Sequence, residues 1–102
     1  MARIYCVEDD ENIRELIVYA LKNNNYNAIG LESSQDLYSQ IEVKLPDLLL
    51  LDIMLPEEDG LSILKKLRNQ PSTKHIPIIM ITAKTSEYDK VIGLDMGADD
   101  YI

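Results

Sequence analysis

Carboxylate side chains follow two of the apolar runs in this sequence. Glu8-Asp9-Asp10-Glu11 comes directly after the run 4–7, and Asp52 comes directly after four leucines at 48–51. If these runs are neighbouring strands of a parallel sheet, their carboxyl ends share one edge, where ligands bind in open α/β sheets. Crowded carboxylates repel one another, and a bound hard cation such as Mg²⁺ relieves that repulsion. The pattern therefore predicts a cation site made of oxygen ligands.

The acids after the first run also have a purely structural interpretation. Acidic residues at the start of a helix are stabilised by the helix dipole, and this interpretation is favoured for Asp10 and Glu11. For Asp9 and Asp52 the site interpretation is favoured. An aspartate that ends an all-leucine buried strand has little structural rationale.

Asp52 is also a candidate nucleophile. A carboxylate is ionised near neutral pH and can itself accept a phosphoryl group, so it needs no general base. Phosphoryl transfer then depends mostly on positioning and on neutralising the phosphoryl oxygens. The minimum set for this transfer is present except for one cation. It consists of Asp52 as acceptor, Mg²⁺ on Asp9 and Asp52, and the hydroxyl of Thr82, which follows the apolar run 78–81.

Elements that would position these residues alternate along the chain. Short apolar runs at 4–7, 27–31, 48–53 and 78–81 predict strands, and the densest of them predict strands buried on both faces. Helices are predicted from an apolar stripe (Ile13, Leu16, Ile17, Ala20, Leu21), from a cap at Ser33 with Asp36, from Ile63, Leu64 and Leu67, and from a cap at Ser86 with Asp89. Residues 99–102 would begin a fifth strand. This alternation predicts a doubly wound parallel α/β sheet with right-handed crossovers.

Size and charge exclude several classes of protein. The 102 residues allow one domain, and a net charge of −8 leaves no electrostatic footprint for nucleic acid or an anionic membrane. The single cysteine, Cys6, excludes an intrachain disulfide and is expected to be inert core, and His75 is expected at the surface. Without a signal peptide or a membrane-spanning run, the expected compartment is the cytoplasm. Glu57, Glu58 and Asp59 are expected to form a solvated rim.

Four segments together carry a specific resemblance. VEDDENIREL, PDLLLLDIMLPEEDGL, PIIMITA and GADDYI, in this order and spacing, strongly resemble the receiver domain of two-component response regulators, and most of all the OmpR/PhoB type. The resemblance covers essentially the whole chain. It implies a flavodoxin-like fold with strand order 2-1-3-4-5 and, for residues 1–102, a receiver domain that is incomplete at its carboxyl end.

The resemblance also implies a role for each site residue. Asp52 matches the phosphoacceptor, Asp9 the direct ligand of Mg²⁺ (or Mn²⁺), Glu8 an acid that acts through water, and Met54 a backbone-carbonyl ligand. Thr82 matches the switch hydroxyl and Tyr101 the switch aromatic. The implied partner is a sensor histidine kinase, with homodimerisation through the helix 4/strand 5 face, no direct DNA contact by this domain, and no enzymatic activity beyond slow self-phosphorylation and self-dephosphorylation.

One departure keeps an alternative open. The family's Lys-Pro pair and its fifth helix would follow Ile102, so an exposed apolar patch near the first and fifth strands is expected. Without that lysine, the chain could be a receiver-like interaction module that works without phosphorylation. A phosphatase of the haloacid-dehalogenase kind is disfavoured, because Asp52-Ile53-Met54 lacks its Asp-x-Asp pattern. A nucleotide or flavin module is disfavoured for want of a glycine-rich turn.

Overall fold

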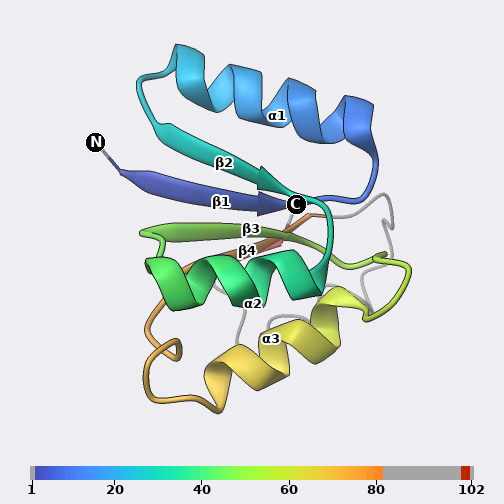
Figure 1. The fold of residues 1–102 in the computed structure, drawn as a ribbon, viewed down its shortest axis with the longest axis vertical. Coiled ribbons are helices and arrows are strands. Elements are labelled where there is room, and N and C mark those ends of the chain that lie inside the picture. Colours follow the sequence, from blue (N-terminus) through green and yellow to red (C-terminus); the bar gives the residue numbers. More distant parts are fainter. Residues whose placement is uncertain (1, 82–99, 102) are drawn as a thin grey trace.

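A parallel sheet forms the centre of the molecule (Figure 1). The computed structural model describes residues 2–81 and the backbone of residues 100–101. The strands follow the expected order β2-β1-β3-β4-β5, and all their pairings are parallel. The elements are β1 (Arg3–Val7), α1 (Glu11–Asn23), β2 (Asn27–Leu31), α2 (Ser34–Val43), β3 (Leu48–Asp52), α3 (Gly60–Arg68), β4 (Ile78–Ile81) and β5 (Asp100–Tyr101). The predicted helix around 86–97 lies outside the described residues.

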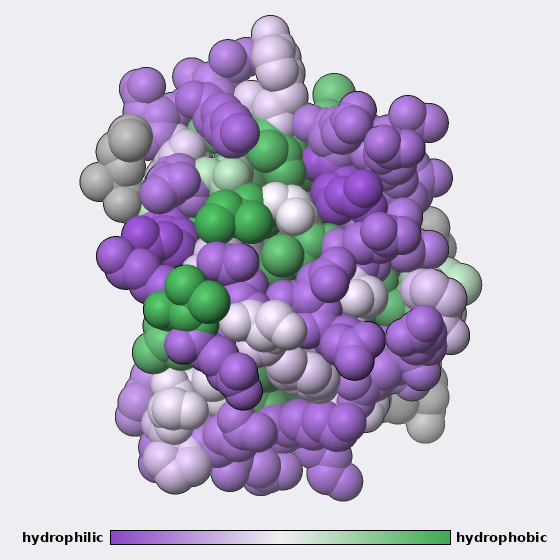
Figure 2. Space-filling model, viewed as in Figure 1, coloured by the Kyte–Doolittle hydropathy of each residue, from purple (hydrophilic) through white to green (hydrophobic). Residues whose placement is uncertain are grey.

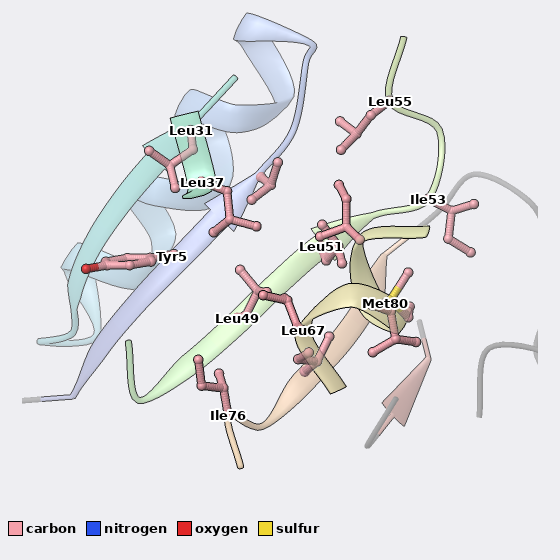
Figure 3. Close-up of a cluster of buried hydrophobic side chains, with 14 residues drawn as sticks. Tyr5, Leu31, Leu37, Leu49, Leu51, Ile53, Leu55, Leu67, Ile76 and Met80 are labelled. Carbon is pink, nitrogen blue, oxygen red and sulfur yellow. The ribbon is translucent and has the colours of Figure 1, made fainter. Parts of the chain in front are cut away.

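The helices divide between the two faces of the sheet. Right-handed crossovers place α1 on one face and α2 with α3 on the other (Figure 1). The main hydrophobic core lies between the sheet and the α2–α3 layer (Figure 3). Its fully buried members include Leu49, Leu51 and Ile78 from the strands and Leu64 and Leu67 from α3.

Burial on the two faces of the sheet is unequal. In β1 every residue after Arg3 is buried, as predicted. In β3 and β4 the prediction of burial on both faces is wrong, because Leu48, Leu50 and Ile79 are only half-buried. Of the helices that the structure describes, α1 packs on β1 and β2 rather than on β3 and β4.

Helix α1 (Glu11–Asn23) forms where the apolar stripe predicts a helix. Part of the stripe is exposed, because Ile13 and Leu16 are 48% and 68% exposed, whereas Ile17 and Leu21 are half-buried. The helix lies with Arg14 and Val18 over Gly30 of β2, where an added Cβ would come within 3.0 Å of Arg14 Cγ. The expected apolar patch near the first and fifth strands stays a prediction. The β5 side chains lie outside the described residues.

The helix ends follow local signals in the sequence. The Ser33 hydroxyl accepts a hydrogen bond from the Asp36 amide at 3.2 Å, as the capping pattern predicts. Helix α1 ends in the run of three asparagines, where Asn25 adopts a left-handed backbone with φ of 68°. The face seen in Figure 2 is mostly hydrophilic. Within residues 2–81, no helix is long and apolar enough to cross a membrane.

Candidate functional site

The expected convergence of acids is present at the carboxyl ends of β1 and β3. Val7 pairs with Leu51, so Glu8 and Asp9 come to lie beside Asp52. One carboxylate oxygen from each of these three residues lies within 4.8 Å of the others. Asp9 is exposed, whereas Glu8 and Asp52 are each only 7% exposed. The arrangement concentrates negative charge at the edge where α/β sheets bind ligands.

The crowding acts most strongly on Glu8. Burial, a hydrogen bond shared with the Asp52 side chain, and the negative charge of Asp52 raise the pKa of Glu8 from 4.5 to about 8. The amide of Asp10 donates to Glu8 Oε1 at 3.3 Å and opposes this rise only in part. Near neutral pH, Glu8 therefore holds a proton that a bound cation would displace.

Backbone and arginine contacts fix the position of the acids. The Met54 amide donates to Asp52 Oδ1 at 3.0 Å, which orients the carboxylate. On the β1 side, the Arg14 guanidinium donates to the Glu8 carbonyl at 2.9 Å and to the Asp9 carbonyl at 3.4 Å. Arg14 therefore ties the β1–α1 turn to α1.

The β3–α3 loop (residues 53–59) returns tightly onto Asp52. The Gly60 amide donates to the Ile53 carbonyl at 2.8 Å, and the Leu55 amide donates to the same oxygen at 3.1 Å. A Cβ on Gly60 would lie 2.8 Å from Ile53 Cα and closer still to the Asp52 carbonyl oxygen. Only glycine fits at this point, because any side chain would push the loop away from Asp52.

The donor set fits a hard divalent cation. Three carboxylates meet within one small volume, and two of them are buried. Oxygen-only ligands suit Mg²⁺ or Mn²⁺, which are commonly held by one or two carboxylates together with water and phosphate oxygens. Asp9, Asp52 and Glu8 are the residues that would hold such an ion.

Most of the predicted site residues fall within the described part of the chain. Glu8, Asp9 and Asp52 come together, and Met54 contacts Asp52 through its backbone. Thr82 lies outside the described residues. Tyr101 lies in β5, but its side chain is not among those described.

Glu57 and Asp59 are exposed, as expected for a solvated rim, whereas Glu58 is half-buried and departs from that expectation. Asp59 caps α3, because its carboxylate accepts from the Ser62 amide at 2.9 Å. An aspartate directly before a glycine and an apolar stripe is a signal for such a cap. Glu58 is only 17% exposed and is bound to α2 and α3. Its partner Tyr38 is twenty positions away in the sequence, so no local sequence pattern predicts that contact.

The single cysteine, Cys6, and the single histidine, His75, lie where they were expected, in the core and at the surface. Cys6 is fully buried, and burial raises the pKa of its thiol to about 12, so the thiol stays protonated and unreactive. His75 is exposed.

The raised pKa of Glu8 predicts a stability that depends on pH. The folded protein retains a proton that the unfolded chain releases, so this contribution is complete below pH 4.5 and is lost as pH rises to about 8. We expect urea unfolding of the metal-free protein to show falling stability between pH 5 and pH 8. Glu8→Gln should flatten this slope, and saturating Mg²⁺ should reduce it. Equal slopes in the wild type and in Glu8→Gln would contradict the assignment to Glu8.

Comparison with known proteins agrees with the fold. The family model "Response regulator receiver domain" matches residues 4–102. The chain is 42% identical over 100 residues to the alkaline phosphatase synthesis transcriptional regulatory protein PhoP of Bacillus subtilis, covering 98% of this chain and 41% of that protein. It is 46% identical over 102 residues to the response regulator ArlR of Staphylococcus aureus, covering 100% of this chain and 45% of that protein.

A solved receiver-domain structure is also similar to this chain. The BeF₃-activated N-terminal receiver domain of Klebsiella pneumoniae RstA is similar with a TM-score of 0.90 and 35% identity, covering 98% of this chain and 83% of that one. The chain spans less than half the length of the two regulators above. Receiver domains of response regulators bind a divalent metal ion and interact with histidine kinases. This chain belongs to the response regulator receiver domain family, and it is a phosphoryl-accepting signalling domain of the two-component type.

Proposed function

We propose that Asp52 is the residue that accepts the phosphoryl group. The observation that carries this proposal is its placement. Asp52 is a buried carboxylate at the end of β3, oriented by the Met54 amide and within 4.8 Å of two further acids. An Asp52 oxygen attacks phosphorus, the phosphorus–nitrogen bond to the kinase histidine breaks, and its electron pair stays on the imidazole, which takes up a proton.

The other acids prepare Asp52 for this step. Asp9, Asp52 and the Met54 carbonyl would hold Mg²⁺ or Mn²⁺, with Glu8 acting through water. When bound, the ion neutralises the crowded carboxylates and the phosphoryl oxygens. A bound cation would favour the ionised form of Glu8, so that Glu8 would no longer share a proton with the Asp52 carboxylate. The chain's own contribution is therefore positioning and charge balance, with no enzymatic activity beyond slow self-phosphorylation and self-dephosphorylation.

The output is a change of binding surface. Thr82 and Tyr101 would act as the switch hydroxyl and the switch aromatic, and the changed face would favour a homodimer. The relatives PhoP and ArlR are by name a transcriptional regulatory protein and a response regulator. By analogy, a parent protein of this domain would regulate transcription through a DNA-binding part elsewhere in its chain. The intact set of acids favours this function over an interaction module that works without phosphorylation.

Intact mass spectrometry tests the proposal. We expect the protein, incubated with Mg²⁺ and acetyl phosphate, to gain the mass of one phosphoryl group, and Asp52→Asn to gain none. Chelating the metal should abolish the gain in the wild type. Asp10→Asn is the matched control, because asparagine keeps the helix cap that Asp10 makes with the Ile13 amide at 3.0 Å. Equal phosphoryl gain by the wild type and Asp52→Asn would overturn the proposal.

A further inference from the structure

Glu58 lies at the centre of a side-chain cluster that joins the β3–α3 loop to α2 and α3. Its Oε1 accepts a hydrogen bond from the Tyr38 hydroxyl of α2 at 3.0 Å. Its Oε2 accepts one from the Ser62 hydroxyl of α3 at 2.9 Å and lies 2.5 Å from the Lys66 ammonium. Lys66 also lies 5.9 Å from the centre of the Tyr38 ring. We call these four side chains the Glu58 cluster.

Charges in the cluster are matched at neutral pH. The hydrogen bond from Lys66 is the main cause that lowers the pKa of Glu58, so this carboxylate is ionised. Burial is the main cause that raises the pKa of Tyr38, so its hydroxyl keeps the proton that it donates. The Glu58 side chain is 17% exposed, which makes the ion pair less screened than one at the open surface. The cluster is therefore a stable link between the loop and both helices.

The middle of the loop, Pro56 and Glu57, is exposed. A hollow of about 230 Å³ separates Leu55–Glu58 from the start of α2 at Ser33–Gln35, and it extends to Asp9. The Met54 side chain is 55% exposed. Among residues 54–59, only Leu55 is buried and only Glu58 is half-buried. Glu58 thus ties the far half of the loop to α2 through its hydrogen bond with Tyr38.

We propose that the Glu58 cluster positions the phosphoryl-acceptor site. The loop that it tethers begins at Asp52, carries Met54, and closes on Ile53 through Gly60. A tether on the far half of this loop reduces the conformations open to its first residues before a ligand binds. Groups that hold ligands in place commonly matter to metal affinity although they do not touch the ion. Glu58 is a positioning residue in this sense, and the proposal rests on the proposed role of Asp52.

Calorimetric titration with MgCl₂ at pH 7.5 tests the proposal. We expect Glu58→Gln and Tyr38→Phe each to weaken Mg²⁺ binding about three- to tenfold, the effect of losing one or two hydrogen bonds. Glu57→Gln is the matched control for charge, because it removes one negative charge from the adjacent position. Glu57 is exposed and makes no hydrogen bond or ion pair with the residues that the structure describes. The ratio between Glu58→Gln and Glu57→Gln therefore isolates positioning from simple electrostatic attraction.

Amide hydrogen exchange supplies a readout that needs no metal. The amides of Leu55 and Gly60 both bond to the Ile53 carbonyl, so they report how well the loop is closed. We expect both to exchange faster in Glu58→Gln and Tyr38→Phe than in Glu57→Gln. Binding and exchange equal to those of Glu57→Gln, with only thermal stability lowered, would reduce the cluster to a structural role and overturn the proposal.

The proposed function and the tether can fail separately. The proposed metal site is wrong if the wild type binds no Mg²⁺, or if Asp9→Asn binds Mg²⁺ as tightly as the wild type. Amide hydrogen exchange is then the remaining test of the tether. Faster exchange in Glu58→Gln then supports a tethered loop, and unchanged exchange contradicts it.

Discussion

Gly60→Ala is expected to destabilise the protein by about 3 kcal/mol and to slow phosphoryl uptake by about 100-fold. At the first turn of a helix, alanine would ordinarily be as good as glycine or better. Here alanine is expected to lower the stability, because the new Cβ would lie 2.8 Å from Ile53 Cα and would overlap the Asp52 carbonyl oxygen. Both neighbours are backbone atoms of the acceptor's own segment, so relieving the clash must move Asp52.

Gly30→Ala is the matched control for this change. Its added Cβ would meet Arg14 Cγ at 3.0 Å and Val18 Cγ2 at 3.1 Å, both atoms of side chains rather than backbone. The Arg14 side chain can shift, so the expected loss of stability is smaller. Urea unfolding and the initial rate of mass gain with acetyl phosphate measure the two effects. If Gly60→Ala and Gly30→Ala have equal free energies of unfolding, the close contact of Gly60 with the Asp52 segment does not determine the loss of stability.

Asp9→Asn is expected to weaken Mg²⁺ binding by about 100-fold while leaving the fold intact. Groups that only support metal ligands cost about tenfold to 100-fold when they are removed, and loss of a direct ligand should reach at least the upper end of this range. Asp9 is exposed, and its negative charge contributes to the raised pKa of Glu8. The stability of the metal-free protein should therefore stay the same or rise slightly.

Asp10→Asn again supplies the comparison for Asp9→Asn. It removes one charge from the adjacent position and keeps the cap of α1. Calorimetric titration with Mg²⁺ should show a much smaller change for Asp10→Asn than for Asp9→Asn. If both variants lower the affinity equally, the ion responds only to bulk charge and Asp9 is not a ligand.

Patterns that act over a few residues could be read from the sequence. The strand β4 matches its apolar run at Ile78–Ile81, and the cap at Ser33 follows from its spacing to Asp36. The meeting of Glu8, Asp9 and Asp52 follows from placing two runs side by side in a parallel sheet.

Features that depend on how distant elements pack could not be predicted in the same way. The stripe through Ile13 and Leu16 predicts helix α1 but not its orientation, since the helix lies with Arg14 and Val18 over Gly30, which belongs to another element. Glu58 resembles its exposed neighbour Glu57 until α2 brings Tyr38 to it. The close return of Gly60 onto Asp52 depends on a loop path that residue types alone do not specify.

The position of the phosphoryl group on the chain decides whether Asp52 is the acceptor. The sequence has 18 acidic residues, three of which meet in the site. Borohydride reduces an aspartyl phosphate to an alcohol, so peptide mapping of the phosphorylated and reduced protein identifies the acceptor. We expect the reduced residue at position 52 and at no other position. Reduction at Asp9 or at any acid outside the site, with Asp52 unchanged, would contradict the account.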